Sequence, residues 1–190
     1  MINNRFIGSW SLISQHFILP DNSIHYPMGQ NMLGRINYEK QGTMAAQLYR
    51  GDRAKFTTED WLQGSDSEIK NAFLTALTYF GRYHIDEEQG IVTHTVEGCL
   101  FPNWVGNQQI RHYQFEEDRL TLRTPPLQMN NSSLVGVLIW QKVKNSDGLF
   151  IYIRMLHLLL VVAGGLGGLP HYCWPNMVIE KASKHLDDEL

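Results

Sequence analysis

One histidine of this sequence lies in a short segment that alternates between apolar and polar residues. In residues 91–98, Val92, His94 and Val96 fall on one face of a strand, because successive side chains of a strand point to opposite sides. This face is the more apolar of the two, so we expect His94 to point into the interior. An imidazole can exchange a proton near neutral pH, which makes His94 a candidate catalytic residue.

A second segment places an arginine among aromatic side chains. In residues 109–115, Arg111 shares a face with Tyr113 and Phe115, and we expect this face to point inward as well. The guanidinium could hold a carboxylate, an enolate or a carbonyl oxygen, so Arg111 is the second candidate catalytic residue. On other strands, the residues expected to join this interior group are Tyr38, Ile36 and Tyr83.

The histidines also raise the question of a metal site. His94 and Glu97 are three residues apart, and on a strand this spacing puts them on opposite faces, so they cannot chelate one ion together. The other candidates, His84 and His112, lie in different strand segments. No phosphate-binding loop, dinucleotide fingerprint or nucleophile elbow is present. We therefore expect no metal and no cofactor.

The elements that must position these residues are strands. The strand-like segments are residues 8–18, 32–39, 43–50, 79–86, 91–98, 109–115, 119–124 and 134–143. Short polar turns, such as Lys40-Gln41-Gly42, join neighbouring segments as in an antiparallel meander. Eight strands of this kind can close into a barrel and leave no exposed edge. We therefore predict an all-β fold, an eight-stranded antiparallel barrel.

One helix is predicted between the third and fourth strands. Ser65 and Glu68 have the spacing of a capping box. The apolar residues that follow at helical spacing are Ile69, Ala72, Phe73, Ala76 and Leu77. We expect this stripe to lie against the barrel, either on the outer wall or as a lid across one mouth.

The interior group has more than one interpretation. It could be a self-satisfied polar network, with the guanidinium stacked on aromatic rings. It could instead be a ligand site, near whose mouth Glu97 and Trp104 would lie. The candidate ligand-binding residues are then Tyr38, Tyr83, His94, Glu97, Trp104, Arg111 and Tyr113.

Composition narrows the class of protein. The 190 residues are 43% hydrophobic and 18% charged, which is a globular composition with room for a single domain. The formal net charge of −3 gives no long-range reason to bind nucleic acid. The first residues lack the features of a secretory signal, and Cys99 and Cys173 are far apart. We expect free thiols and a cytoplasmic protein.

Several motifs together resemble a known family. They are Gly8-Ser9-Trp10, Tyr26-Pro27-Met28-Gly29, Gly81-Arg82-Tyr83-x-Ile85-Asp86, Phe101-Pro102-Asn103-Trp104-Val105-Gly106 and Thr124-Pro125-Pro126. Over residues 6–143 the chain resembles the lipocalin-like domain of bacterial and fungal proteins, a calycin-type barrel often encoded near natural-product gene clusters. The resemblance implies that Trp10 closes the base of the barrel against a basic residue of the last strand, for which Lys142 is the candidate.

Residues 144–190 depart from this pattern and form an atypical C-terminal extension. The segment 150–169 is apolar, but Arg154, His157 and several glycines weaken it as a membrane span. A helix packed on the barrel or on a partner, a poorly ordered extension and a gene-model artefact such as translated intron all remain open. The closing Asp187-Asp188-Glu189-Leu190 resembles a retrieval signal, but no signal for entering that compartment accompanies it.

Two functions are consistent with these features. The first is a protein that binds a small hydrophobic or polycyclic organic ligand in a biosynthetic pathway, such as one for a secondary metabolite. The second is a cofactor-free isomerase or cyclase that steers ring closure of a polyketide or terpenoid intermediate. The identity of the ligand and the oligomeric state stay open.

Overall fold

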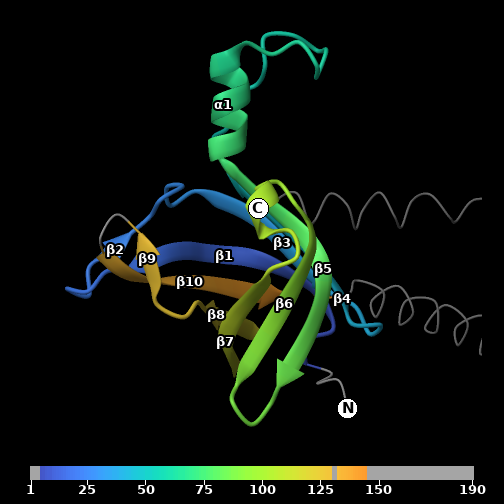
Figure 1. Cartoon of the computed structure of the whole chain (residues 1–190), viewed down its shortest axis with the longest axis vertical. Helices are drawn as coiled ribbons and strands as arrows, with labels where there is room; N and C mark the ends of the chain where they lie inside the picture. Colours follow the sequence, from blue (N-terminus) through green and yellow to red (C-terminus); the bar gives the residue numbers. More distant parts are fainter. Residues whose placement is uncertain (1–4, 130–131, 145–190) are drawn as a thin grey trace, which may run out of the picture. The chain divides into compact units, whose positions relative to one another are not determined.

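The computed structural model describes residues 5–129 and 132–144, and these residues form a closed antiparallel barrel (Figure 1). In chain order the elements are β1 (Gly8–Ile18), β2 (Ile24–His25), β3 (Met32–Tyr38), β4 (Thr43–Arg50), α1 (Asp66–Leu74), β5 (Ala76–Asp86), β6 (Ile91–Cys99), the 3₁₀ helix η1 (Pro102–Trp104), β7 (Gln108–Glu116), β8 (Arg119–Arg123), β9 (Leu127–Met129) and β10 (Ser132–Lys142). The predicted C-terminal extension lies outside the described residues, apart from Lys144.

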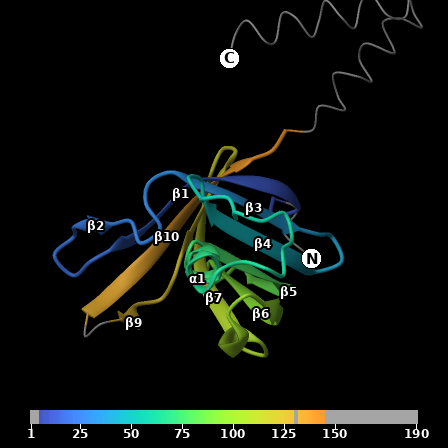
Figure 2. The same ribbon diagram turned by 90° about the horizontal axis from the view of Figure 1, so that it is seen from above.

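Eight long strands close the barrel, and two short ones flank it. The order around the sheet is β1-β3-β4-β5-β6-β7-β8-β10, and β10 pairs with β1 to complete the circle (Figure 2). The closing register runs from Trp10 opposite Lys142 to Ile18 opposite Val135. β2 adds to β1, and β9 adds to β10. The predicted eight-stranded antiparallel barrel is confirmed, and β2 and β9 are additions that the sequence analysis did not predict.

A glycine lets β5 and β6 approach closely at a bulge. The register between these strands shifts between Phe80 and Gly81. A Cβ atom on Gly81 would lie 2.0 Å from the carbonyl oxygen of Thr95 and 2.9 Å from the backbone nitrogen of Glu97. Because both contacts are to backbone, no side-chain movement could relieve them. Glycine is therefore needed at position 81 so that β5 and β6 can lie this close together.

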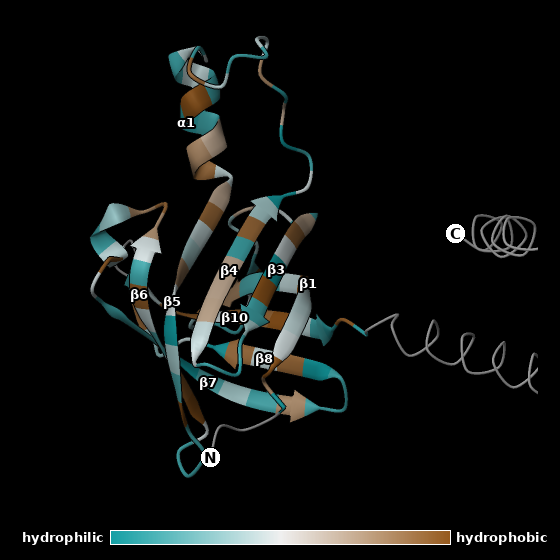
Figure 3. Cartoon of the chain, turned by 90° about the vertical axis from the view of Figure 1, so that its right-hand side faces the viewer, coloured by the Kyte–Doolittle hydropathy of each residue, from teal (hydrophilic) through white to brown (hydrophobic). Residues whose placement is uncertain are grey.

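The core fills the inside of the barrel with inward-facing side chains. Along β6, Val92, His94 and Val96 are fully or almost fully buried, whereas the residues between them keep more exposure. This is the predicted face assignment for β6, and the alternation of hydropathy is visible along the strands in Figure 3. At the base, the Phe6 ring meets those of Tyr38, Tyr113 and Phe115 edge to face.

The helix begins where the sequence predicts and ends earlier. Ser65 and Glu68 form the capping box, and α1 stops at Leu74. Ala76 and Leu77, counted in the predicted helical stripe, instead pair with β4 as the start of β5. The stripe is therefore divided between a helix of about two turns and a strand.

This division also decides how the helix packs. None of its residues is buried, and Ile69, Phe73 and Leu74 are 51%, 42% and 61% exposed. The expectation that an apolar stripe of α1 lies against the barrel wall or covers its mouth is wrong. The preceding loop braces the helix, since Arg53 donates to the carbonyl of Ala72. Figure 1 shows α1 leading directly into β5 at one end of the sheet.

Candidate functional site

A histidine held between two tyrosines lies at the centre of the barrel. His94 reaches inward from β6, Tyr38 from β3 and Tyr79 from β5. The Tyr38 hydroxyl is 2.9 Å from Nε2 of His94, and the Tyr79 hydroxyl is 2.9 Å from Nδ1. Both ring nitrogens are thus hydrogen-bonded to tyrosines, and all three side chains are buried.

Burial sets the charge of this histidine. It lowers the pKa of His94 to about 3, and the nearby positive charge of Arg111 acts in the same direction. The imidazole is therefore neutral near pH 7, with one nitrogen donating and the other accepting. The sequence analysis considered His94 because an imidazole can exchange a proton near neutral pH. With its pKa lowered this far, the environment of His94 does not support such exchange.

Arg111 carries the positive charge of the interior. It points inward from β7, is 8% exposed, and donates to the carbonyl of Ile110 at 2.7 Å and to Oε1 of Gln109 at 3.4 Å. Among residues 5–129 and 132–144 it forms no ion pair with a carboxylate. Burial raises the pKa of Tyr38 and of Tyr79, and the charge of Arg111 partly opposes both shifts. The guanidinium thus acts on all three members of the tyrosine–histidine group.

Two of the predicted aromatic residues pack near the base. The Tyr83 ring meets Tyr38 edge to face at 4.9 Å, and its hydroxyl donates to the carbonyl of Glu39. Tyr113 is half-buried and stacks edge to face on Phe6. Both side chains extend the aromatic wall around the interior group.

The remaining two predicted residues lie in different surroundings. Trp104, in η1, meets the ring of Tyr79 edge to face with centroids 6.0 Å apart, so it borders the interior group. Glu97 points to the outer face of β6, where its carboxylate is 3.1 Å from Nε of Arg82. The structure therefore brings Trp104 to the group and leaves Glu97 outside it.

Tyr79 was not among the site residues predicted from the sequence. Tyr79 lies on the same inward face as Gly81 and Tyr83. It was, however, the first residue of the predicted strand, residues 79–86. The strand in fact begins at Ala76, so Tyr79 is an interior position of β5. The period-two pattern Tyr79–Gly81–Tyr83 is the signal that could have identified it.

Two further buried polar atoms lie on β1 and β10, the strands that close the barrel. Oε1 of Gln15 and Nε1 of Trp140 have no hydrogen-bond partner within the described ranges. Trp140 lies opposite Leu12 and Leu120, both of which belong to or contact the core. An unpaired buried polar group costs about 1–3 kcal/mol, so such atoms are commonly satisfied by water or a ligand.

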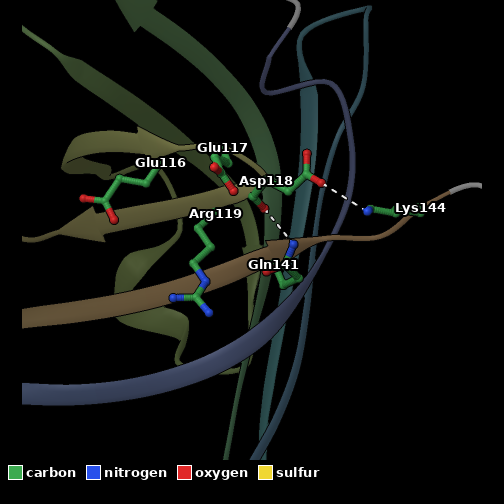
Figure 4. Close-up of a pocket in the computed structure, with 6 residues that line it drawn as sticks. All are labelled: Glu116, Glu117, Asp118, Arg119, Gln141 and Lys144. Atoms are coloured by element: carbon green, nitrogen blue, oxygen red, sulfur yellow. Dashed lines mark hydrogen bonds and ion pairs between the residues drawn. The ribbon is translucent and has the colours of Figure 1, made fainter.

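Of two surface hollows, one lies apart from this group and the other includes Tyr79 in its lining. One, of about 640 Å³, is lined by Glu116, Glu117, Asp118, Arg119, Gln141 and Lys144 (Figure 4). Its charges are partly paired with one another, since Lys144 is 3.6 Å from Asp118. The other, of about 330 Å³, runs along β4, β5 and β6 past outward-facing Gln47 and the exposed ring of Phe80. Neither is lined by His94 or Arg111.

No group of three or more His, Cys, Asp or Glu residues able to hold a metal ion occurs in the described ranges. Among these residues, no helix has the length and apolar character needed to cross a bilayer.

Residues 7–143 match the sequence model of the lipocalin-like domain. The chain belongs to this lipocalin-like family. A curated protein from Aspergillus oryzae (strain ATCC 42149 / RIB 40), described as a 4'-hydroxy-3'-methoxypropiophenone carrier protein, is 30% identical over 107 residues. The alignment covers 53% of this chain and 96% of that protein. The match confirms the resemblance seen in the motifs and agrees with the closed barrel.

Proposed function

We propose that this lipocalin-like protein carries a small organic ligand with an acceptor oxygen, within a secondary-metabolite pathway. The observation behind the proposal is the buried guanidinium of Arg111, which has no carboxylate partner in the described part of the chain. Burying a charge costs free energy unless it is paired or well hydrogen-bonded. A ligand that supplies an acceptor oxygen would lower this cost.

The hydrogen-bond inventory points to the class of ligand. A guanidinium has five N–H donors and no acceptor. Arg111 uses donors for Ile110 and Gln109 and has further N–H groups to offer. Carbonyl, enolate and carboxylate oxygens suit such a donor. The aromatic rings of Trp104, Tyr113 and Tyr79 would give a planar ligand favourable contacts.

The relative from Aspergillus oryzae supports an aromatic ketone. The compound in its description is a propiophenone, which combines an aromatic ring with an acceptor carbonyl oxygen. Partly buried apolar side chains that pack against the core, such as Leu12, Leu138 and Met28, could contact the apolar part of such a ligand. We infer that aryl ketones of this kind are the ligand class to test first.

Binding can be tested with one ligand and two arginine variants. Isothermal titration with 4'-hydroxy-3'-methoxypropiophenone should detect binding by the wild-type protein. Arg111→Met should weaken it about 10- to 100-fold, because a hydrogen bond from a charged group contributes roughly 1.5–3 kcal/mol. The matched control is Arg82→Met, which removes an outer-face arginine paired with Glu97 and should leave affinity unchanged. Equal affinities of the two variants, or no binding by the wild type, would contradict the proposal.

The alternative of a cofactor-free isomerase or cyclase uses the same residues in another way. Because His94 is neutral and both of its nitrogens are bonded, such an enzyme would depend on donors from Arg111 and a tyrosine to stabilise an enolate. A carrier returns its ligand unchanged, whereas an isomerase does not. Mass spectrometry and chromatography of ligand recovered after incubation therefore separate the two functions.

A further inference from the structure

The two tyrosines bonded to His94 cannot both donate to it. A neutral imidazole has one acceptor nitrogen and one N–H group. One tyrosine therefore donates its hydroxyl hydrogen to His94, and the other accepts from the ring and keeps its own hydrogen for a third group. No other acceptor for the hydroxyl of Tyr38 or Tyr79 occurs within the described residues. One buried O–H donor thus lacks an acceptor.

The surroundings of the two hydroxyls differ. Tyr38 ends β3 and is enclosed at the base, with edge-to-face contacts to Phe6 at 5.1 Å and to Tyr83 at 4.9 Å. Tyr38 pairs with Met44, which pairs with Gly81. A hydroxyl hydrogen left without an acceptor in this enclosure would keep the full cost of desolvation.

Tyr79 lies one inward-facing position further from the base. It pairs with Ala46, which pairs with Ile36, two residues before Tyr38 on β3. Its ring contacts Trp104, a half-buried residue of η1. A ligand that entered beside η1 would therefore meet a donor at this position before one at Tyr38.

We propose that Tyr79 donates a hydrogen bond to the acceptor oxygen of the ligand, and that His94 and Tyr38 are positioning residues that hold its hydroxyl in this orientation. Tyr38 donates to Nε2 of His94, and the Nδ1–H group of His94 donates to the oxygen of Tyr79. The Tyr79 hydrogen is then directed away from the histidine. Together with Arg111 it forms a site made of donors, which selects a ketone over a hydrocarbon of the same shape. This inference rests on the proposed carrier function.

The direction of the hydrogen bonds from Tyr38 through His94 to Tyr79 can be measured without any ligand. The ¹⁵N chemical shifts of His94 in the wild-type protein distinguish a protonated from an unprotonated ring nitrogen. We expect Nδ1 to be protonated and Nε2 to be the acceptor. A protonated Nε2 would overturn the proposed direction, whatever the protein binds.

The ligand contact is tested with propiophenone and propylbenzene, which differ in the carbonyl oxygen. Tyr79→Phe should weaken propiophenone binding about three- to tenfold, the range for one lost hydrogen bond, and leave propylbenzene binding within twofold. Tyr38→Phe makes the same chemical change on the other side of His94, and we expect a smaller effect on propiophenone. An equal or larger loss in Tyr38→Phe would overturn the assignment of Tyr79.

The two proposals fail in different ways. If wild-type protein binds no aryl ketone, the carrier function fails, and the role of Tyr79 toward a ligand fails with it, even where the tautomer is the expected one. If the ketone binds and Arg111→Met weakens it while Tyr79→Phe does not, the carrier function stands and the inference about Tyr79 is wrong.

Discussion

The ammonium group of Lys142 lies 4.2 Å from the centroid of the Trp10 ring, across the seam where β1 and β10 close the barrel. The same group donates hydrogen bonds to the carbonyl oxygens of Ile7 and, at 3.1 Å, Arg5. The indole N–H of Trp10 donates to the carbonyl of Phe6 at 2.8 Å. One lysine thus ties the segment before β1 to the last strand, as the family resemblance implied.

Replacing this lysine should destabilise the barrel. We expect Lys142→Met to lower the free energy of unfolding by about 1–2 kcal/mol, because a cation–π contact and two backbone hydrogen bonds are lost. Lys144→Met is the matched control, since Lys144 forms an exposed ion pair with Asp118 and its loss should change stability by less than about 0.5 kcal/mol. Urea denaturation measures both, and equal effects would contradict the role given to Lys142.

A methyl group on Gly81 should be poorly tolerated. Gly81→Ala places a Cβ against the backbone of β6, and we expect a loss of roughly 2–4 kcal/mol of stability. At Gly98 the closest atom to an added Cβ belongs to the ring of Phe80, 2.4 Å away, and this side chain is 56% exposed and free to turn outward. Gly98→Ala should therefore cost clearly less. Thermal melts of the two variants give the comparison, and the reverse order would show that the strands can separate at the bulge.

The buried histidine makes stability depend on pH. His94 has a pKa of about 3 in the folded protein and about 6.5 in an unfolded chain. Above pH 6.5 both states are neutral at this residue and its contribution to stability is fully present. Below pH 6.5 the unfolded chain gains a proton that the folded protein excludes, so stability falls by up to about 1.4 kcal/mol per pH unit until the folded pKa is reached.

Two variants isolate this effect. His94→Gln should flatten the pH dependence of stability between pH 6.5 and 5. Burial also lowers the pKa of His16, but this side chain is only partly buried, so His16→Gln should flatten the curve less. Denaturant titrations at several pH values give the slopes. A wild-type protein equally stable at pH 5 and pH 7 would contradict the burial of a neutral His94.

The closed barrel should not need the C-terminal extension. β10 ends at Lys142 and already completes the pairing with β1, and the family match ends at residue 143. A chain ending at Asn145 should therefore stay soluble, with a β-type circular dichroism spectrum and a cooperative melt. Precipitation or loss of the melt would place part of the extension within the fold.

No metal should be needed for folding or binding. The alternation of His94 and Glu97 across β6 puts the histidine inside and the carboxylate outside, where it pairs with Arg82. Elemental analysis of protein purified without chelators should find far less than one equivalent of zinc, iron or manganese. A stoichiometric metal that survives dialysis would contradict this.

The sequence by itself determined which faces of β6 and β7 are buried. Because the strand repeat is two residues, the apolar neighbours of His94 were enough to place it inside, and the aromatic neighbours of Arg111 did the same. The turn residues between alternating segments were enough to predict a closed meander. These are local properties, set by residues a few positions apart.

The tertiary structure decided what meets inside the barrel. Tyr38 and Tyr79 are 41 positions apart along the printed sequence, and only the register of β3, β4 and β5 brings both hydroxyls to His94. The end of α1 was decided in the same way. Leu77 fits a helical stripe by its spacing, but pairing with Leu48 buries it against the core as part of β5. Strand register depends on contacts between distant segments, and for that reason local spacing could not predict either result.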